Sequence, residues 1–380
     1  MLRIFVVVVV MISILFMVIN QSNSDRTFVY ANSYRLFVYI SNGGDGNIAV
    51  MKLNNETGDL TMVEKIPAGP NVMHMALSPD HRFLYASVRS EPFSIISYSI
   101  NSETGKLTQL SKESLPDNMV YISVDNIGRF LLSVSYTGAK IVVNPIDSNG
   151  LVQAEPIQII PTGPKPHSIL VDQSNRFVYV PHLGNDQIKQ FLFNASTGTL
   201  TPNDPDVVYT KDDSGPRHLV FSPNNKFIFV SNELDGTVYS YEINNKTGAL
   251  TEIQRISVFP PPTMNNELSS DSQNTTIKIA DIHITPDGKW LYVSNRATNT
   301  ITAFSVDDNT GNLTYIGIYD TEEIPRGFNI DPNGNYVIVA GQKSDHVAVH
   351  AINPETGELK ILDRFESGNE PNWIEIVEFY

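Results

Sequence analysis

The chain has 380 residues, of which 41% are hydrophobic, a length that suits one large domain or two average ones. Its 26 Lys and Arg residues are outnumbered by 41 Asp and Glu residues, and the formal net charge is −15 at pH 7. No basic run interrupts this acidic background, so nucleic acid is not an expected partner. The absence of cysteine excludes disulfides, thiolate metal sites and cysteine nucleophiles.

The N-terminus reads as an export segment. A basic start leads into a largely apolar run from Ile4 to Ile19, and a polar stretch follows. This order is typical of a secretory signal peptide, with small or apolar residues suited to cleavage after Ala31. We predict a signal peptide over residues 1–31, with an uncleaved membrane anchor as the alternative. The folded domain, residues 32–380, is then exported to an extracellular, periplasmic or cell-surface location, and is cytoplasmic only if this interpretation is wrong.

A short glycine-containing turn recurs seven times along the rest of the chain. In most copies Thr precedes the glycine, and Leu follows it by one or two positions, as in Asn55-Glu-Thr-Gly58-Asp-Leu60. The seven glycines are Gly58, Gly105, Gly150, Gly198, Gly248, Gly311 and Gly357. Glycine readily adopts the positive φ of a tight hairpin, so each copy predicts a hairpin between two outer strands.

Each hairpin completes a longer repeat. Upstream of it lies a β-branched and aromatic segment such as Phe177–Val180, and upstream again an inner strand such as the one within His218–Asn224. Four antiparallel strands every ~46 residues predict an all-β fold, a seven-bladed β-propeller. The first repeat lacks its inner strand, and Pro371–Phe379 resembles one, so the C-terminus is predicted to close the ring in blade one.

One interval between glycines is longer than the others. A polar, proline-rich insertion from Pro260 to Thr276 separates the fifth and sixth repeats. A loop of this length in a compact fold is usually functional or disordered, and a lid over the site is one hypothesis for it.

Alignment of the repeats reveals two columns of polar residues. The first, near the start of the inner strand, holds His74, His167, His218 and Asp281, with Arg217 and Arg326 one residue earlier. The second, just after the second strand, holds Arg89, Tyr136, Glu233, Arg296 and Gln342, with Gly43 and Leu183 as its remaining members. Antiparallel strands bring both columns to one mouth of the channel, where guanidinium groups suit a small anion. A solvated lining without function is the alternative.

Five motifs occur in chain order: Gly215–Pro223, Ser231–Leu234, Ala280–Gly288, Pro325–Asn329 and Ala340–Ser344. Together they resemble the signatures of the seven-bladed propeller 6-phosphogluconolactonase family, over roughly residues 34 to 379. The resemblance implies a lactone hydrolase of carbohydrate metabolism, in the pentose phosphate pathway, that acts on 6-phosphogluconolactone or a related sugar-acid lactone.

The same family is similar to fungal carboxy-muconate lactonizing enzymes, in which a His, two Arg and a Glu are proposed to act. Matched by motif, the resemblance implies a catalytic set of His167, Arg217, Glu233 and Arg296. A lactonase needs a base for water and a donor for the oxyanion, so we expect His167 or Glu233 as the base and the two arginines as clamps. The expected substrate-binding residues are His218, Asp281, His283, Arg326 and Gln342.

The export segment argues against the family's own substrate, because a phosphorylated sugar lactone is a cytoplasmic metabolite. Two other functions remain open: a non-catalytic extracytoplasmic propeller that binds protein or glycan, and a muconate-type cyclase or lyase. The expected ligand is a small anionic lactone or sugar acid. We expect no cofactor, no metal, no nucleic acid, no membrane contact beyond an N-terminal anchor, and a monomer.

Overall fold

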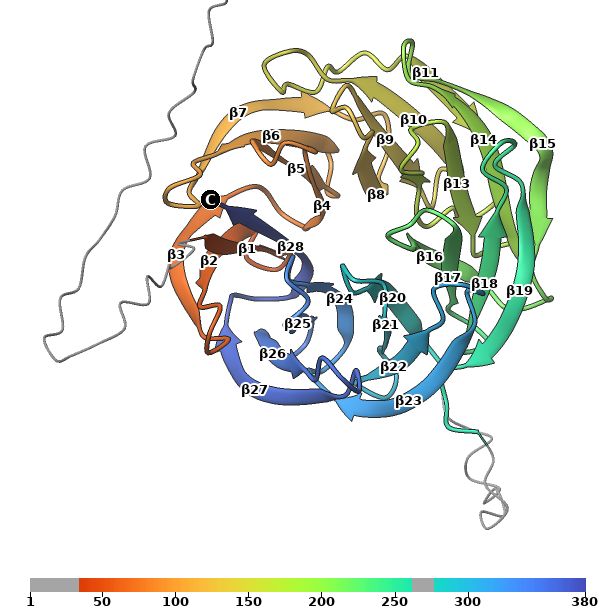
Figure 1. Ribbon diagram of the computed structural model, residues 1–380. Helices are drawn as coiled ribbons and strands as arrows, with labels where there is room; N and C mark the ends of the chain where they lie inside the picture. The colour runs from red at the N-terminus through yellow and green to blue at the C-terminus, as the bar shows by residue number, and fades with distance from the viewer. Residues whose placement is uncertain (1–33, 262–276) are drawn as a thin grey trace, which may run out of the picture. The chain divides into compact units, whose positions relative to one another are not determined.

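A computed structural model describes residues 34–261 and 277–380, and these form seven four-stranded antiparallel sheets set in a ring (Figure 1). Tyr34–Tyr380 makes one compact unit. The described residues contain no helix, and so none long and apolar enough to cross a membrane. The predicted seven-bladed β-propeller is confirmed. The predicted signal peptide, and residues 262–276 of the predicted insertion, lie outside the described residues.

Each blade runs from an innermost strand at the channel to an outermost strand at the rim. Blade one is β28 (Pro371–Phe379), β1 (Arg35–Asn42), β2 (Asn47–Leu53) and β3 (Leu60–Pro67). Blade two is β4 (Val72–Leu77), β5 (Phe83–Val88), β6 (Ser94–Ile100) and β7 (Leu107–Ser114), and blade three is β8 (Met119–Val124), β9 (Phe130–Ser135), β10 (Lys140–Pro145) and β11 (Gln158–Pro161). Blade four is β12 (Leu170–Val171), β13 (Phe177–His182), β14 (Gln187–Asn194) and β15 (Thr199–Tyr209).

The remaining three blades follow the same order. Blade five is β16 (Pro216–Phe221), β17 (Phe227–Asn232), β18 (Thr237–Ile243) and β19 (Leu250–Ser257). Blade six is β20 (Ile279–Ile284), β21 (Trp290–Asn295), β22 (Thr300–Val306) and β23 (Leu313–Asp320). Blade seven is β24 (Pro325–Ile330), β25 (Tyr336–Gly341), β26 (His346–Ile352) and β27 (Leu359–Glu366).

The two ends of the domain meet in blade one. Strand β28 pairs with β1 along its length, from Arg35 opposite Phe379 to Asn42 opposite Pro371. The predicted closure of the ring by the C-terminal strand is therefore confirmed, and it covers the edge that β1 would otherwise expose.

The recurring glycines lie in the turns between third and fourth strands, as predicted, and two constraints act on them. All seven have φ between 72° and 80°, which L side chains rarely adopt. Each also faces an aromatic ring near the start of the second strand of the preceding blade: a Cβ on Gly311 would lie 2.6 Å from the Phe227 ring. The seven rings belong to Tyr336, Phe37, Phe83, Phe130, Phe177, Phe227 and Trp290. The repeated glycine therefore sets the distance between neighbouring blades.

Blade three departs from the regular hairpin. Its turn at Gly150 is closed by a single bridge between Ile146 and Val152, and the outermost strand β11 begins only at Gln158. The core lies between the blades, because both faces of each sheet pack against a neighbour. Strand β9 is buried at every residue, whereas five of the eight residues of the rim strand β7 are exposed.

Candidate active site

Six of the seven innermost strands carry a β-bulge or irregularity directly after their first paired residue. In β16 the pairing steps from Pro216 opposite Asn232 to His218 opposite Ser231, which leaves Arg217 without a partner on β17. The same step leaves Arg326 unpaired in β24 and Asn372 unpaired in β28. A bulge re-aims the side chain of the extra residue, so the repeat itself creates a position at the channel mouth where a blade can present a functional group.

The structure corrects the register of His167. Its predecessor Pro166 pairs with His182, the last residue of β13, just as the prolines before Arg217 and Arg326 pair with the last residues of β17 and β25. His167 therefore shares the bulge position of these two arginines and lies one residue before the column in which it was expected. The proline common to the three strands was the sequence signal for this register.

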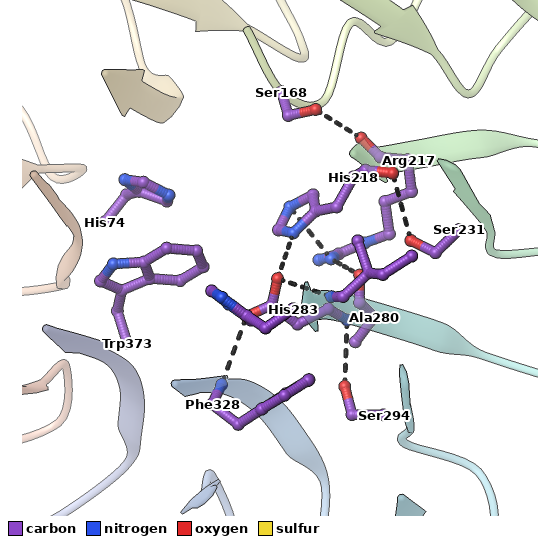
Figure 2. Close-up of polar contacts among 12 residues, drawn as sticks. His74, Ser168, Arg217, His218, Ser231, Ala280, His283, Ser294, Phe328 and Trp373 are labelled. Atoms are coloured by element: carbon purple, nitrogen blue, oxygen red, sulfur yellow. Dashed lines mark hydrogen bonds and ion pairs between the residues drawn. The ribbon is translucent and has the colours of Figure 1, made fainter. Parts of the chain in front are cut away.

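Bulge residues and the residues after them line a partly open pocket at the channel, whose volume of about 260 Å³ includes space open to solvent. Its lining comes from the innermost segments of six of the seven blades and consists of Met73, His74, Val120, His167, Arg217, His218, Arg326, Asn372 and Trp373. In Figure 2, His74 and Trp373 face His218 and His283 across the channel. Four predicted site residues, His167, Arg217, His218 and Arg326, are thus brought to one cavity.

The second polar column occupies the position that the sequence predicts, directly after each second strand. Glu233 follows β17 and is held by two arginines: its Oε2 lies 2.9 Å from Nε of Arg217, and its Oε1 lies 2.8 Å from Nη2 of Arg296. Burial raises the pKa of the Glu233 carboxyl, but the charges of Arg217 and Arg296 outweigh it and hold the pKa below its ordinary value. Glu233 is therefore an ionised carboxylate with a guanidinium against each oxygen.

The charge of Arg326 is offset only in part, by Glu233 at longer range. It is half-buried, lines the pocket, and makes no ion pair in the described part of the chain. Burial, with the like charges of Arg217 and Arg296, lowers the pKa of Arg326. Such a guanidinium gains most from an incoming anion, which would relieve both desolvation and repulsion.

Asp281 is the centre of a hydrogen-bonded cluster, and its partners His218, His283 and Phe328 are labelled in Figure 2. Its Oδ1 lies 2.8 Å from Nδ1 of His218, and its Oδ2 lies 3.2 Å from Nε2 of His283. The backbone N–H groups of Ile282 and Phe328 also donate to this carboxylate, at 3.0 and 3.2 Å. Burial and the charge of Arg217 lower the pKa of His218 to about 4 against the raising effect of Asp281, so its imidazole is neutral at pH 7.

His167 is a buried, neutral imidazole. Burial lowers its pKa, and the charges of Arg217 and Arg326 lower it further. Its Nδ1 has no hydrogen-bond partner among the described residues. The ring centroid lies 5.1 Å from that of His218 and 5.6 Å from that of Tyr136. The pocket therefore holds a free base beside a cluster of cations.

Comparison with known proteins shows which family has this sequence and fold. The model of the family described as seven-bladed β-propeller lactonases matches residues 30–376. The chain belongs to this lactonase family. Similar proteins include the 6-phosphogluconolactonases of Serratia proteamaculans and Pectobacterium carotovorum, each 38% identical over 340 residues, which are 90% of this chain and 98% of the relative. A crystal structure from Bacteroides fragilis has a TM-score of 0.80 at 25% identity and covers 93% of this chain and 100% of its own.

Membership confirms the family that the five motifs indicated and its enzyme class, a lactone hydrolase. In this lactonase-family propeller some predicted residues lie outside the pocket lining. Gln342 follows β25, and its backbone N–H donates to the carbonyl of Ile324 beside the start of β24. Arg89 donates hydrogen bonds to the sulfur of Met73 in its own blade and to Oδ1 of Asn118 beside the next blade. Among the described residues no group of three or more His, Asp or Glu is placed to hold a metal ion.

The sequence analysis missed four lining residues of the lactonase pocket, the apolar Met73 and Val120 and two residues of β28. Asn372 and Trp373 come from β28, and they stand at the same positions as Arg326 and the residue after it. The motif Pro371-Asn372-Trp373 repeats the proline that precedes the other bulge residues, so the signal was present in the chain. In the sequence this motif is separated from the rest of blade one by the other six blades, so a comparison of neighbouring residues does not reveal it.

Proposed function

We propose that this protein hydrolyses a sugar-acid lactone, 6-phosphogluconolactone or a related lactone, in the pocket at the propeller mouth. Two relatives that are 38% identical over 90% of the chain carry the name 6-phosphogluconolactonase. The observation that carries the proposal is the presence in one pocket of a neutral His167, whose Nδ1 has no partner, and an Arg326 that makes no ion pair among the described residues. That pair supplies a base for water and a contact for an anionic substrate.

His167 is the better of the two candidate bases. Both oxygens of Glu233 are ion-paired, so the carboxylate has little room to accept a proton. His167 is in its free-base form, and its Nδ1 has no partner in the described residues. Glu233 then serves to hold Arg217 and Arg296 at the mouth.

The reaction balances with these groups alone. Water attacks the lactone carbonyl carbon while His167 accepts its proton, and the negative charge that develops on the carbonyl oxygen is stabilised by Arg217. When the ring C–O bond breaks, the departing oxygen takes the proton from His167. The product is an open hydroxy acid, whose carboxyl group then releases one proton to solvent and becomes a carboxylate.

The test is a hydrolysis assay on 6-phosphogluconolactone and on the unphosphorylated sugar lactone, with the spontaneous rate subtracted. Replacement of His167 by Ala removes the base and should lower kcat about 100-fold or more. Arg82→Ala is the matched control, because that arginine is 68% exposed at its side chain and lies away from the mouth. A variant at His167 that keeps the wild-type kcat would contradict the assignment of the base.

Arg326→Ala separates substrate binding from chemistry. Loss of one charge-assisted hydrogen bond should raise KM for an anionic lactone about 10-fold, with a smaller effect on a neutral one. Equal effects on both lactones would place the anion elsewhere. No turnover of any lactone by the wild-type protein would refute the proposed function as a whole.

We further propose that the substrate is met outside the cytoplasm, because the predicted signal peptide exports the domain. Fractionation of cells and N-terminal sequencing of the mature protein test this. A mature chain that begins at Asn32 supports cleavage, and a cytoplasmic protein that keeps Met1 contradicts it.

A further inference from the structure

We propose that Asp281 is a positioning residue that fixes the tautomer of His218 and, through it, the guanidinium of Arg217. The part of this inference that concerns activity rests on the proposed function, in which Arg217 contacts the lactone. The positioning itself is a property of the hydrogen bonds among these three side chains.

The tautomer follows from the donors and acceptors. Nη1 of Arg217 lies 3.1 Å from Nε2 of His218. A guanidinium can only donate, so Nε2 of His218 must accept, and the single proton of the neutral ring is then on Nδ1. That N–H points to Oδ1 of Asp281 at 2.8 Å and donates to it. The chain runs in one direction, from Arg217 through His218 to Asp281.

The Asp281 carboxylate is itself fixed by three neighbouring blades. His218 lies on β16 of blade five, Ile282 on β20 of blade six and Phe328 on β24 of blade seven, and all three donate to it. The backbone N–H of Asp281 also donates to Oγ of Ser294 at 3.0 Å. Only 3% of the Asp281 side chain is exposed. It therefore offers no free oxygen to a substrate and acts through His218, which lines the pocket.

The guanidinium of Arg217 depends on this arrangement. Nη1 also donates to the carbonyl of Ala280 (Figure 2). Nε is ion-paired with Glu233. If His218 carried its proton on Nε2, an N–H would face Nη1 of Arg217, and two donors cannot share that contact. The guanidinium would move, and with it the donor for the developing oxyanion.

The experiment uses the full chain with Asp281→Asn. In either orientation the NH₂ group of the new amide faces a backbone N–H, that of Ile282 or that of Phe328. In the orientation that faces Ile282 it also meets Nδ1–H of His218, and this repulsion favours the Nε2–H tautomer. Nitrogen-15 NMR of histidine-labelled protein reads the tautomer, and the missing signals of His218→Gln assign it. We expect wild-type His218 to be protonated on Nδ1 and Asp281→Asn to lose that form. The kcat should fall about 10- to 100-fold, with a smaller change in KM.

Asp331→Asn is the matched control. Asp331 is also buried, and its oxygens accept backbone N–H groups of Asn333, Asn335 and Tyr336 in a turn of blade seven. This variant should lose stability but keep the His218 signals and the wild-type kcat. Its behaviour separates a general loss of folding from a loss of positioning.

Several results would overturn the inference. One is a wild-type His218 with its proton on Nε2, which decides the matter even if Asp281→Asn does not fold. Another is an Asp281→Asn protein whose kcat falls while the His218 signals stay unchanged. If the wild-type protein turns over no lactone, the proposed function fails, and the NMR result still decides whether Asp281 sets the tautomer.

Discussion

Glu375 is an ionisable residue on the innermost strand β28 that the proposed reaction does not use. Nε1 of Trp373 donates to its Oε1 at 2.8 Å, and His283 and Asp281 are the charged or titratable neighbours that act on it. Burial raises the pKa of Glu375 to about 7, against the lowering effects of the Trp373 hydrogen bond and of His283. The carboxyl is thus neutral in mildly acidic solution, where an ordinary glutamate is ionised.

This raised pKa predicts a specific dependence of stability on pH. The folded state binds the proton more tightly than the unfolded state, so the contribution is fully present below pH 4.5 and is lost as the pH rises through about 7. Glu375→Gln keeps an acceptor for Trp373 and cannot ionise. Between pH 5 and 8, the free energy of unfolding of the wild type should fall relative to this variant by about 1–3 kcal/mol.

Urea unfolding of both proteins at several pH values measures the difference. The comparison cancels the opposite contribution of buried histidines such as His182 and His350, whose low pKa values cost stability as the pH falls. Parallel curves for the two proteins would show that Glu375 titrates normally.

At the scale of single residues, the sequence predicted which residue types reach the mouth, but not which hydrogen bonds join them. The motifs around Arg217 and Glu233 could be recognised because they recur between blades. The chain from Arg217 through His218 to Asp281 joins blades five and six, and it depends on side-chain directions that the bulges set. Spacing along the sequence carries no record of those directions.

At the scale of elements, the hairpin glycines do two things at once. They supply a positive φ, and they let an aromatic ring of the preceding blade lie against the turn. The period of these glycines was enough to predict seven blades, because each repeat needs the same turn and the same contact. The start of β11 was not predictable, since the turn at Gly150 is followed by irregular chain up to Gln158.

Gly311→Ala tests the double constraint. The new Cβ would sit at φ 72° and 2.6 Å from the Phe227 ring. A left-handed backbone costs about 1–2 kcal/mol and overpacking about 1–3 kcal/mol, so the free energy of unfolding should fall by about 2–5 kcal/mol. Denaturant unfolding followed by tryptophan fluorescence measures it.

Gly288→Ala is the control for the backbone part alone. Its φ is 77°, and the nearest atom to a new Cβ is Cδ of Pro223 at 3.3 Å, so no ring is displaced. This variant should lose only about 1–2 kcal/mol. Equal losses in the two variants would mean that the contact between blades adds nothing to the cost of the turn.

At the scale of the whole molecule, β28 links folding to the site. The strand completes blade one by pairing with β1, and two of its residues, Asn372 and Trp373, line the pocket. The prediction of ring closure succeeded because Pro371–Phe379 has the residue pattern of an innermost strand. The consequence for the pocket could not be read in the same way, because it requires the bulge at Asn372 to be known.

Deletion of residues 371–380 should therefore abolish both the fold and the site. Trp373, Ile374, Ile376 and Val377 are all buried, and burial of such a side chain contributes roughly 1.5–3 kcal/mol. Four of them amount to about 6–12 kcal/mol, comparable with the ~5–15 kcal/mol that stabilises a typical domain. The truncated protein should show no cooperative unfolding and should aggregate through the exposed edge of β1. Removal of Tyr380 alone, which is 87% exposed, is the control and should leave the unfolding transition unchanged. A truncated monomer that unfolds cooperatively would mean that six complete blades and three strands suffice for folding. Strand β28 would then be needed for the pocket alone.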